Sequence, residues 1–181
     1  MSPFKNALKE FIFYAGRHRI AERTGGKLCG DKIYLKYLGQ NIYFDLTRFT
    51  FSSLKLDEFD KTLIVRYFYQ ASGFSPKNKW LSFLDLPEGM HHYQPFVYEA
   101  LKPLAEKALL PERLSCLDAV KLAFGSESYQ IYPLPRLPLA VIKWENQKSQ
   151  VLFDQVCLSY LKTVDLYVLG IKTVNYLTGG I

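Results

Sequence analysis

Two adjacent histidines stand near the middle of the chain, in the segment KWLSFLDLPEGMHHYQPF at residues 79–96. Neighbouring side chains diverge by roughly 100° on a helix and point to opposite faces of a strand, so His91 and His92 are not placed to chelate one metal ion together. Either imidazole could instead supply one axial ligand to a tetrapyrrole, which takes its remaining affinity from an apolar aromatic pocket. The simpler alternative, which we favour for an isolated pair, is a surface turn whose histidines face water.

The aromatic residues near the histidine pair would suit such a pocket. The chain contains 13 Tyr, 13 Phe and 2 Trp, and Met90, Tyr93 and Phe96 border the pair. Aromatic rings give large contact areas, and Tyr and Trp also carry polar tips that need partners. This enrichment fits a ligand pocket or a stacking surface, although a densely packed core is the default interpretation.

The motifs of the common catalytic and cofactor sites are absent from the sequence. It has no G-x-G-x-x-G, no phosphate-binding loop ending in Gly-Lys-Ser/Thr, no H-E-x-x-H and no G-x-S-x-G. The GGK at residues 25–27 is interpreted as a helix stop. Cys29, Cys116 and Cys157 lie far apart, so the chain has no iron–sulfur or zinc motif. No set of nucleophile, base and orienting group can be assembled, and the sequence names no reaction.

The net charge of +6 is unevenly distributed. Residues 1–40 carry eight Lys or Arg against three acidic residues, whereas the rest of the chain carries 15 basic and 14 acidic groups. Such asymmetry could mark a face that binds nucleic acid. We favour a solvated basic helix, because no motif of a nucleic-acid-binding fold accompanies the charges.

The amino-terminal residues show no signal-peptide core, and their longest apolar run, residues 11–15, is too short to span a membrane. An odd number of scattered cysteines is typical of a reducing compartment. We therefore expect a cytoplasmic protein that does not associate with membranes.

Hydrophobic periodicity predicts a basic amphipathic helix over residues 1–24 that stops at the following glycine pair. Two tyrosine-rich runs predict a β-hairpin that turns at residues 39–41. A second helical pattern runs from Asp57 to Gly73. The amino-terminal third is therefore expected to contain two helices around one hairpin.

The middle of the chain mixes strand and helix patterns. The segment WLSFLDL at residues 80–86 fits a short strand. Helical patterning resumes after Pro95, and because Pro103 falls inside this run we expect a kink or two short helices. The S-x-x-D at residues 115–118 predicts a capping box that opens a helix ending at Gly125.

Strand patterns at residues 129–132 and 139–144 are separated by three prolines, which indicate a linker or a sheet edge. The end of the chain, VLFDQVCLSYLKTVDLYVLGIKTVNYL, predicts two helices, the second beginning near Thr163. Elements that cluster by type favour the α+β class. We predict one domain over residues 1–181, in which a core at residues 25–178 packs several helices on a small antiparallel or mixed sheet.

Several phrases, taken together in their order and spacing, resemble one family of domains of unknown function that is found mainly in anaerobic bacteria and archaea. The resemblance spans residues 21–170. The phrases are KNKWLSFLDLPEG, YQPF, LPRLPLAVIKWE, VLFD and SYLKTVDLYVLG.

Some members of that family are fused to a cysteine-rich iron–sulfur domain and are labelled corrinoid iron–sulfur proteins. The resemblance therefore implies a corrinoid or redox context, with no established activity. An iron–sulfur centre is not implied for this chain, which lacks the cysteine motif. The acidic stretch that is typical of the family after Trp144 is reduced here to Glu145.

The leading hypothesis is a domain that binds a small aromatic or tetrapyrrole-like ligand, such as a corrinoid or haem, in anaerobic metabolism. One alternative is a non-catalytic module that binds a redox protein partner, and another is nucleic-acid binding through the basic helix, which we rank last. No metal site is predicted. The residues expected to form the ligand site are Trp80, His91, His92, Tyr93, Phe96 and Trp144.

Overall fold

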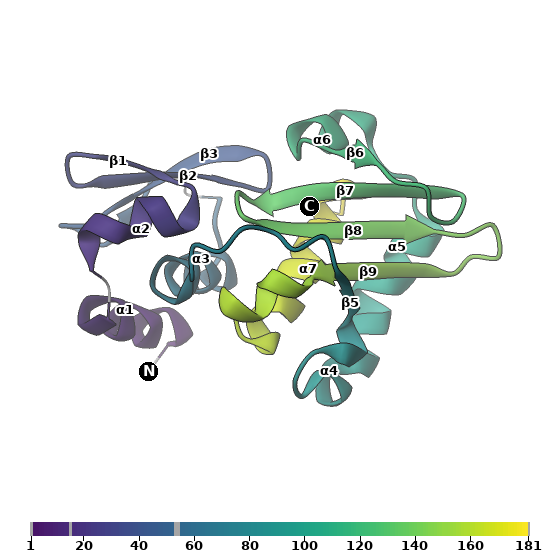
Figure 1. Cartoon of the computed structure of the whole chain (residues 1–181), viewed down its shortest axis with the longest axis horizontal. Coiled ribbons are helices and arrows are strands. Elements are labelled where there is room, and N and C mark those ends of the chain that lie inside the picture. Colours follow the sequence, from purple (N-terminus) through teal and green to yellow (C-terminus); the bar gives the residue numbers. More distant parts are fainter. Residues whose placement is uncertain (1, 15, 53–54, 181) are drawn as a thin grey trace.

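Two antiparallel sheets form the framework of the protein in the computed structural model, which describes residues 2–14, 16–52 and 55–180 (Figure 1). The α+β class predicted from the sequence is confirmed, and both sheets are antiparallel rather than mixed. The four-stranded sheet has the order β1 (Lys27–Cys29), β2 (Lys32–Tyr37), β3 (Gln40–Asp45) and β4 (Thr50–Phe51). The five-stranded sheet has the order β5 (Trp80–Ser82), β9 (Ser149–Asp154), β8 (Leu137–Lys143), β7 (Glu127–Leu134) and β6 (Val120–Lys121).

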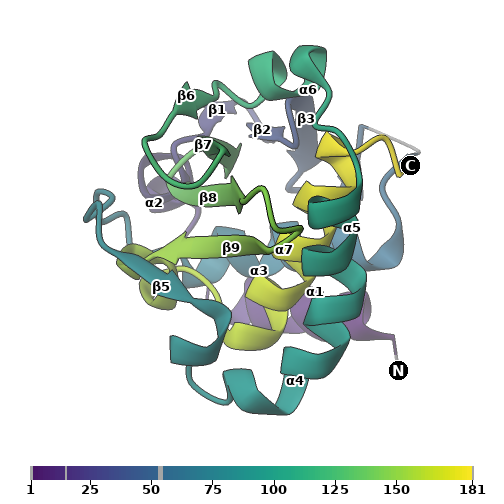
Figure 2. The same ribbon diagram turned by 90° about the vertical axis from the view of Figure 1, so that its right-hand side faces the viewer.

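The helices fall into two groups, one for each sheet. Below the four-stranded sheet lie α1 (Pro3–Tyr14) and α3 (Glu58–Gln70), with α2 (Arg17–Thr24) in front of them (Figure 1). The carboxy-terminal α7 lies between β9 and α5 in the second view (Figure 2). The helical segments of this second group are α4 (Gly89–Phe96), α5 (Lys102–Glu106), α6 (Pro111–Cys116) and α7 (Thr163–Leu177).

The four-stranded sheet buries one face and leaves the other to solvent. Along β2, the side chains of Ile33, Leu35 and Tyr37 are buried, while the residues between them are exposed or half-buried. This alternation follows from the period of two along a strand. The buried face packs on α1 and α3, where the Phe11 and Phe44 rings meet edge to face at 5.7 Å. The predicted hairpin is confirmed, and its strand β3 begins at Gln40.

The predicted amino-terminal helix over residues 1–24 is two helices, α1 and α2. The glycine pair does stop the second of them, since Gly25 takes the left-handed conformation, with φ of 72°, at the end of α2. The predicted helix from Asp57 is confirmed as α3. Its first turn carries a capping box in which Asp57 and Asp60 each accept a hydrogen bond from the backbone N–H of the other.

Three predictions for the second half of the chain are wrong. Ser115 lies in the last turn of α6 instead of opening a helix, because the chain turns at Asp118, whose φ is +52°. In place of the first of the two predicted carboxy-terminal helices, the chain forms strand β9, in which Val151 and Phe153 are buried, followed by a short 3₁₀ helix. The prolines mark neither a linker nor an edge. They lie at the turn between β7 and β8, where the pairing shifts register and ladder hydrogen bonds are interrupted.

The histidines lie within a helix and not on a turn, because α4 begins at Gly89. The helix then widens into a π-helical turn at Val97–Leu101 before α5. Pro103 lacks the N–H that would bond the Glu99 carbonyl, and its ring would clash there. Of the two expected outcomes, a kink or two short helices, the structure has two short α-helices joined by the π-helical turn.

An aromatic cluster joins α4, α7 and the five-stranded sheet. Phe96 is fully buried and stacks on Phe83, with ring centroids 4.2 Å apart and planes 12° from parallel. The Phe153 ring lies 6.3 Å from Phe96. Helix α7 approaches closely because it has no side chain at Gly170, where a Cβ would lie 2.7 Å from the Phe96 ring. The cluster fixes the α4 helix against the sheet.

Asp154 ties the long loop before β5 to the end of β9. Its carboxylate is fully buried and accepts hydrogen bonds from the backbone N–H groups of Lys77, Asn78 and Val156, at 3.0, 2.6 and 2.8 Å. Such bonds offset the cost of burying a charge. Asp154 also caps the short 3₁₀ helix at Gln155–Ser159 by accepting the hydrogen bond from Val156.

Ion pairs connect α3 to α7 across the middle of the molecule. Lys172 pairs with Asp57 and Asp60, and Asp60 also accepts a hydrogen bond of 2.8 Å from the Tyr37 hydroxyl. Arg66 binds Asp165, with Nη1 and Oδ1 2.6 Å apart. Burial raises the pKa of Asp165, and Arg66 offsets that effect only in part. None of the helices among the described residues has the length and apolar character needed to cross a membrane.

We predict that Asp154→Asn destabilises the fold by about 2–3 kcal/mol, because the amide NH₂ would face a buried backbone donor and leave it unsatisfied. The free energy of unfolding from urea titration measures the effect. Glu145→Gln, in an exposed loop, is the matched control and should change stability by less than about 0.5 kcal/mol. Equal effects of the two substitutions would contradict this role of Asp154.

A second prediction concerns the pH dependence of stability. Burial alone would raise the pKa of Asp57, but bonds from Lys172 and from the Asp60 N–H outweigh it and lower the pKa. The unfolded chain then binds the proton more readily than the folded one, so this contribution is present above the usual aspartate pKa of about 4 and is lost as the pH falls. The stability difference between wild type and Asp57→Asn should shrink on acidification. A difference that stays constant in urea titrations across this range would refute it.

Candidate functional site

Two of the six residues predicted to bind a ligand meet at one hollow. Tyr93 on α4 and Trp144 at the end of β8 line a space of about 710 Å³ between the helical segment and the β8–β9 hairpin. They are 51 positions apart in sequence and reach the hollow from opposite sides. Its volume lies within the range of about 300–1,000 Å³ that is usual for small-molecule sites. We call this space the Tyr93–Trp144 hollow.

The polar tips of these two aromatic residues are free. The buried tyrosines satisfy their hydroxyls, as in the bonds from Tyr67 to the Thr24 carbonyl and from Tyr160 to the Phe74 carbonyl. In the described part of the chain, neither the Tyr93 hydroxyl nor the Trp144 indole N–H has a hydrogen-bond partner, and both side chains are half-buried. They can therefore offer a ligand both ring faces and hydrogen bonds.

The π-helical turn forms one wall of the hollow. Val97 and Leu101 line it, and the Leu101 carbonyl accepts a hydrogen bond of 2.5 Å from the Ser149 hydroxyl on the facing hairpin. π-helical turns are frequent at functional sites. Opposite them, the amide side chains of Asn146 and Gln147 supply both donors and acceptors.

The other four predicted residues lie elsewhere. His91 is exposed, and Phe96 is part of the buried aromatic cluster. His92 is half-buried, with its ring 5.8 Å from that of Tyr167, and lines a separate hollow of about 420 Å³. Trp80 is half-buried on the edge strand β5. The six residues therefore do not surround one cavity.

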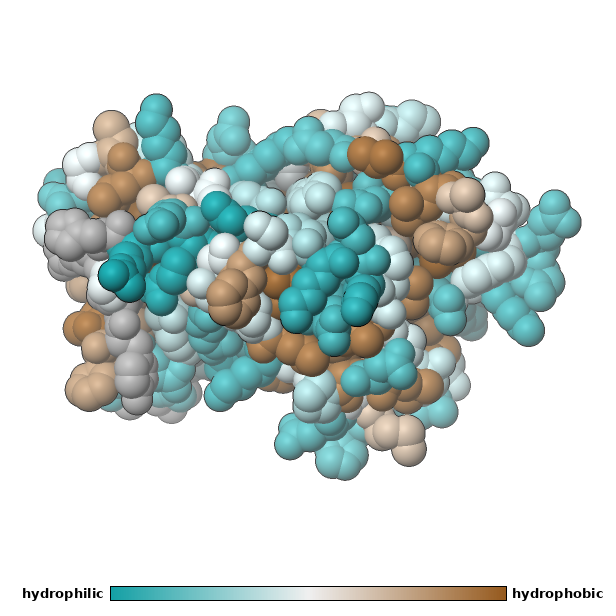
Figure 3. All heavy atoms as spheres, in the orientation of Figure 1, coloured by the Kyte–Doolittle hydropathy of each residue, from teal (hydrophilic) through white to brown (hydrophobic). Residues whose placement is uncertain are grey.

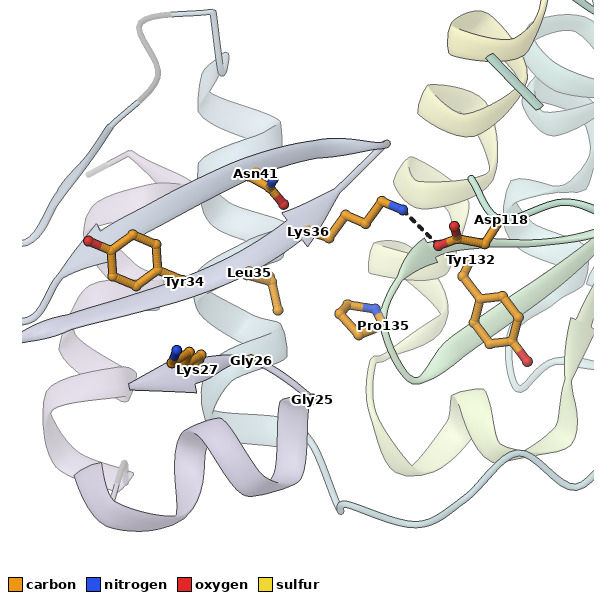
Figure 4. A pocket seen from close by; sticks show the side chains of 10 residues that line it. All are labelled: Gly25, Gly26, Lys27, Tyr34, Leu35, Lys36, Asn41, Asp118, Tyr132 and Pro135. Atoms are coloured by element: carbon orange, nitrogen blue, oxygen red, sulfur yellow. Dashed lines mark hydrogen bonds and ion pairs between the residues drawn. The ribbon is translucent and has the colours of Figure 1, made fainter. Parts of the chain in front are cut away.

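A second open space, the inter-sheet groove, lies where the two sheets meet (Figure 4). It has a volume of about 720 Å³. In Figure 4, Lys36 of β2 reaches across to Asp118, with Nζ and Oδ2 2.7 Å apart. The residues that define the groove include Gly26, Lys27, Tyr34, Lys36, Asp118 and Tyr132.

The groove opens onto the solvent face of the four-stranded sheet. Lys32, Tyr34 and Lys36 alternate with the buried residues of β2, so they share this face. Their cross-strand partners in the register, which lie on the same face, include Lys27 and Tyr43 opposite Tyr34. Basic and aromatic side chains are thus interleaved on one sheet face.

Sequence reasoning missed this face. The GGK at residues 25–27 was interpreted only as a helix stop, which is confirmed, yet the same three residues also line the groove. The signal was present in the alternation of the β2 sequence KIYLKY, where every second residue is Lys or Tyr and the others are Ile, Leu and Tyr. Only the pairing with β1 and β3 collects these residues into one surface.

The cysteines differ in their surroundings. Cys157 is buried, and burial together with the charge of Asp154 raises the pKa of its thiol to about 12, so it remains protonated and inert. Cys29 and Cys116 are exposed free thiols.

Comparison with known proteins identifies one family. A family model described as a domain of unknown function, DUF3786, matches residues 18–176. No curated protein and no solved structure matches the chain.

Proposed function

The chain belongs to the DUF3786 family of domains of unknown function, and we propose that it binds a small ligand with a flat aromatic ring in the Tyr93–Trp144 hollow. The observation that carries the proposal is the meeting of two half-buried aromatic side chains with free polar tips at one hollow of about 710 Å³. Ligand sites usually combine apolar and aromatic walls with a few polar groups.

The energetics favour a ring over a flexible chain. A ring that packs on an aromatic side chain contributes about 0.5–1.5 kcal/mol beyond the area that it buries. The Tyr93 hydroxyl and the Trp144 N–H would add hydrogen bonds at the ring edge. Two exposed lysines, Lys102 and Lys148, and one exposed glutamate, Glu106, flank the hollow, so its charged rim suits a neutral ring or one with a single negative charge.

A tetrapyrrole is one form that such a ligand can take, as the resemblance to corrinoid-associated proteins implied. Neither His91 nor His92 lines the hollow, so the affinity would come from the aromatic walls, with no axial histidine. The alternative of a protein partner has one observation in its favour. Hydrophobic surface gathers near β5 among hydrophilic side chains, and Leu84 and Met90 in the adjoining segments are 41% and 76% exposed (Figure 3).

A fluorescence titration tests the proposal. Trp80→Phe leaves Trp144 as the sole tryptophan, so its emission reports on the hollow. Riboflavin, haem and cobalamin serve as the flat-ring probes. We expect saturable quenching by at least one probe, weakened about tenfold by Tyr93→Ala because one stacking wall and one hydroxyl are lost.

Tyr98→Ala provides the matched control, since Tyr98 lies on the π-helical turn, is 65% exposed and does not line the hollow. His91→Ala and His92→Ala test for an axial ligand in the absorbance spectra of haem and cobalamin. Equal losses of affinity in Tyr93→Ala and Tyr98→Ala, or no saturable quenching by any probe, would refute the proposal. A spectral shift that one histidine substitution abolishes would place the ligand at that histidine and not in the Tyr93–Trp144 hollow.

A further inference from the structure

We propose that the inter-sheet groove is a second binding site, for a small ligand that joins a flat ring to a phosphate, as a nucleoside monophosphate does. The groove lies on the four-stranded sheet, on a different part of the molecule from the Tyr93–Trp144 hollow, and the two sites share no residue. The inference is therefore independent of the function proposed above.

Lys27 is the residue of the groove that can bind an anion, and two further lysines lie near it on the same sheet face. Among the residues that the structure describes, Lys27 has no ion-pair partner, whereas Lys36 is held by Asp118. Lys32 lies on the same sheet face, with Nζ 4.6 Å from the centre of the Tyr43 ring. An ammonium group without a partner at the rim of a groove is a ready contact for a phosphate oxygen.

The aromatic part of the groove is Tyr34. Its side chain is 41% exposed on the solvent face of the sheet, although the chain has other tyrosines that are fully buried. Tyr34 lies opposite Lys27 in the register, so the two residues are direct cross-strand neighbours on one face of the sheet. The Tyr43 ring flanks Tyr34, with centroids 5.6 Å apart. A ligand ring can stack on this exposed face while its phosphate contacts Lys27.

The backbone brings the two strands together at this point. A Cβ at residue 26 would lie 2.7 Å from the Tyr34 carbonyl oxygen, so only glycine permits the approach of β1 to β2 here. Asn41 on β3, opposite Lys36, offers an amide donor and an acceptor to the edge of a ring.

The extent of the groove favours a single nucleotide unit over a nucleic-acid strand. The Lys36–Asp118 ion pair spans it from β2 to the segment before β6, so that pair closes one side (Figure 4). The carboxylate of Asp118 would also repel the next phosphate of a strand. A space of about 720 Å³ is typical of a small-molecule site.

The Lys36–Asp118 ion pair leads to a prediction that is specific to this site. Because Asp118 neutralises Lys36, replacing the carboxylate by an amide releases a second ammonium group for the phosphate. Asp118 has φ of +52°, a conformation that asparagine tolerates well, so Asp118→Asn should leave the fold intact. A substitution that strengthens binding is a readout that damage to the fold does not produce.

The test is a calorimetric or fluorescence titration of the full chain with adenosine 5′-monophosphate at low salt, with adenosine as the uncharged comparison. We expect saturable binding of the monophosphate, weaker binding of adenosine, and a loss of affinity as salt is added. Lys27→Glu should weaken binding of the monophosphate about tenfold, and Asp118→Asn should strengthen it. Tyr34→Ala should weaken the binding of both compounds.

Lys121→Glu is the matched control, because it makes the same charge change at an exposed position outside the groove. Equal weakening by Lys27→Glu and Lys121→Glu would reduce the effect to net charge and overturn the proposal. No saturable binding of the monophosphate, or no gain with Asp118→Asn, would overturn it as well.

Two further measurements distinguish this site from nucleic-acid binding and from the Tyr93–Trp144 hollow. A single-stranded oligonucleotide that binds much more tightly than the monophosphate, with affinity lost in Lys27→Glu, would overturn the single-unit site in favour of nucleic-acid binding. Riboflavin binding reported by Trp144 should be unchanged in Lys27→Glu, so failure at one site is distinguishable from failure at the other.

Discussion

The buried carboxylate of Asp154 is the interaction on which the arrangement of the five-stranded sheet and its helices depends. It accepts hydrogen bonds from two backbone N–H groups in a loop more than seventy positions earlier in the chain and from the N–H of Val156 in the first turn of the following 3₁₀ helix. A fully buried charge is tolerated only when its lone pairs are satisfied, so the loop and the end of β9 must stay together. That constraint pairs β5 with β9, and the chain then enters α4 beside the sheet.

Helix α7 extends this constraint to the amino-terminal half. It packs on Phe96 through Gly170 and binds α3 through Lys172 and Asp165. Breaking either pair would leave a largely buried carboxylate without its counter-charge, which is far more costly than losing an exposed ion pair. The same contacts that hold the halves together therefore also fix the relative positions of the two sheets.

Both candidate sites lie where separate elements meet. The Tyr93–Trp144 hollow forms between a helix widened by Pro103 and the β8–β9 hairpin, and the inter-sheet groove forms where β2 approaches the segment before β6. The two differ in chemistry. The first is aromatic with exposed charges of both signs at its rim, and the second has an unpaired lysine and an exposed tyrosine on one sheet face. The two spaces share no lining residue, so each can be altered without changing the other.

The sequence by itself determined the α+β class, the β2–β3 hairpin, helix α3 and the stop at Gly25, because local periodicity and turn chemistry specify these elements. It did not determine β9, because the segment VLFDQV is compatible with a helix or a strand. Only its pairing with β5 and β8 makes it a strand. The residues predicted for the ligand site include Tyr93 and Trp144, which line the hollow, but also Phe96, which is in the core. The sequence does not distinguish an aromatic residue of a core from one of a pocket. The interleaved face of β1, β2 and β3 was decided by tertiary structure alone, because cross-strand register unites residues that are distant along the chain.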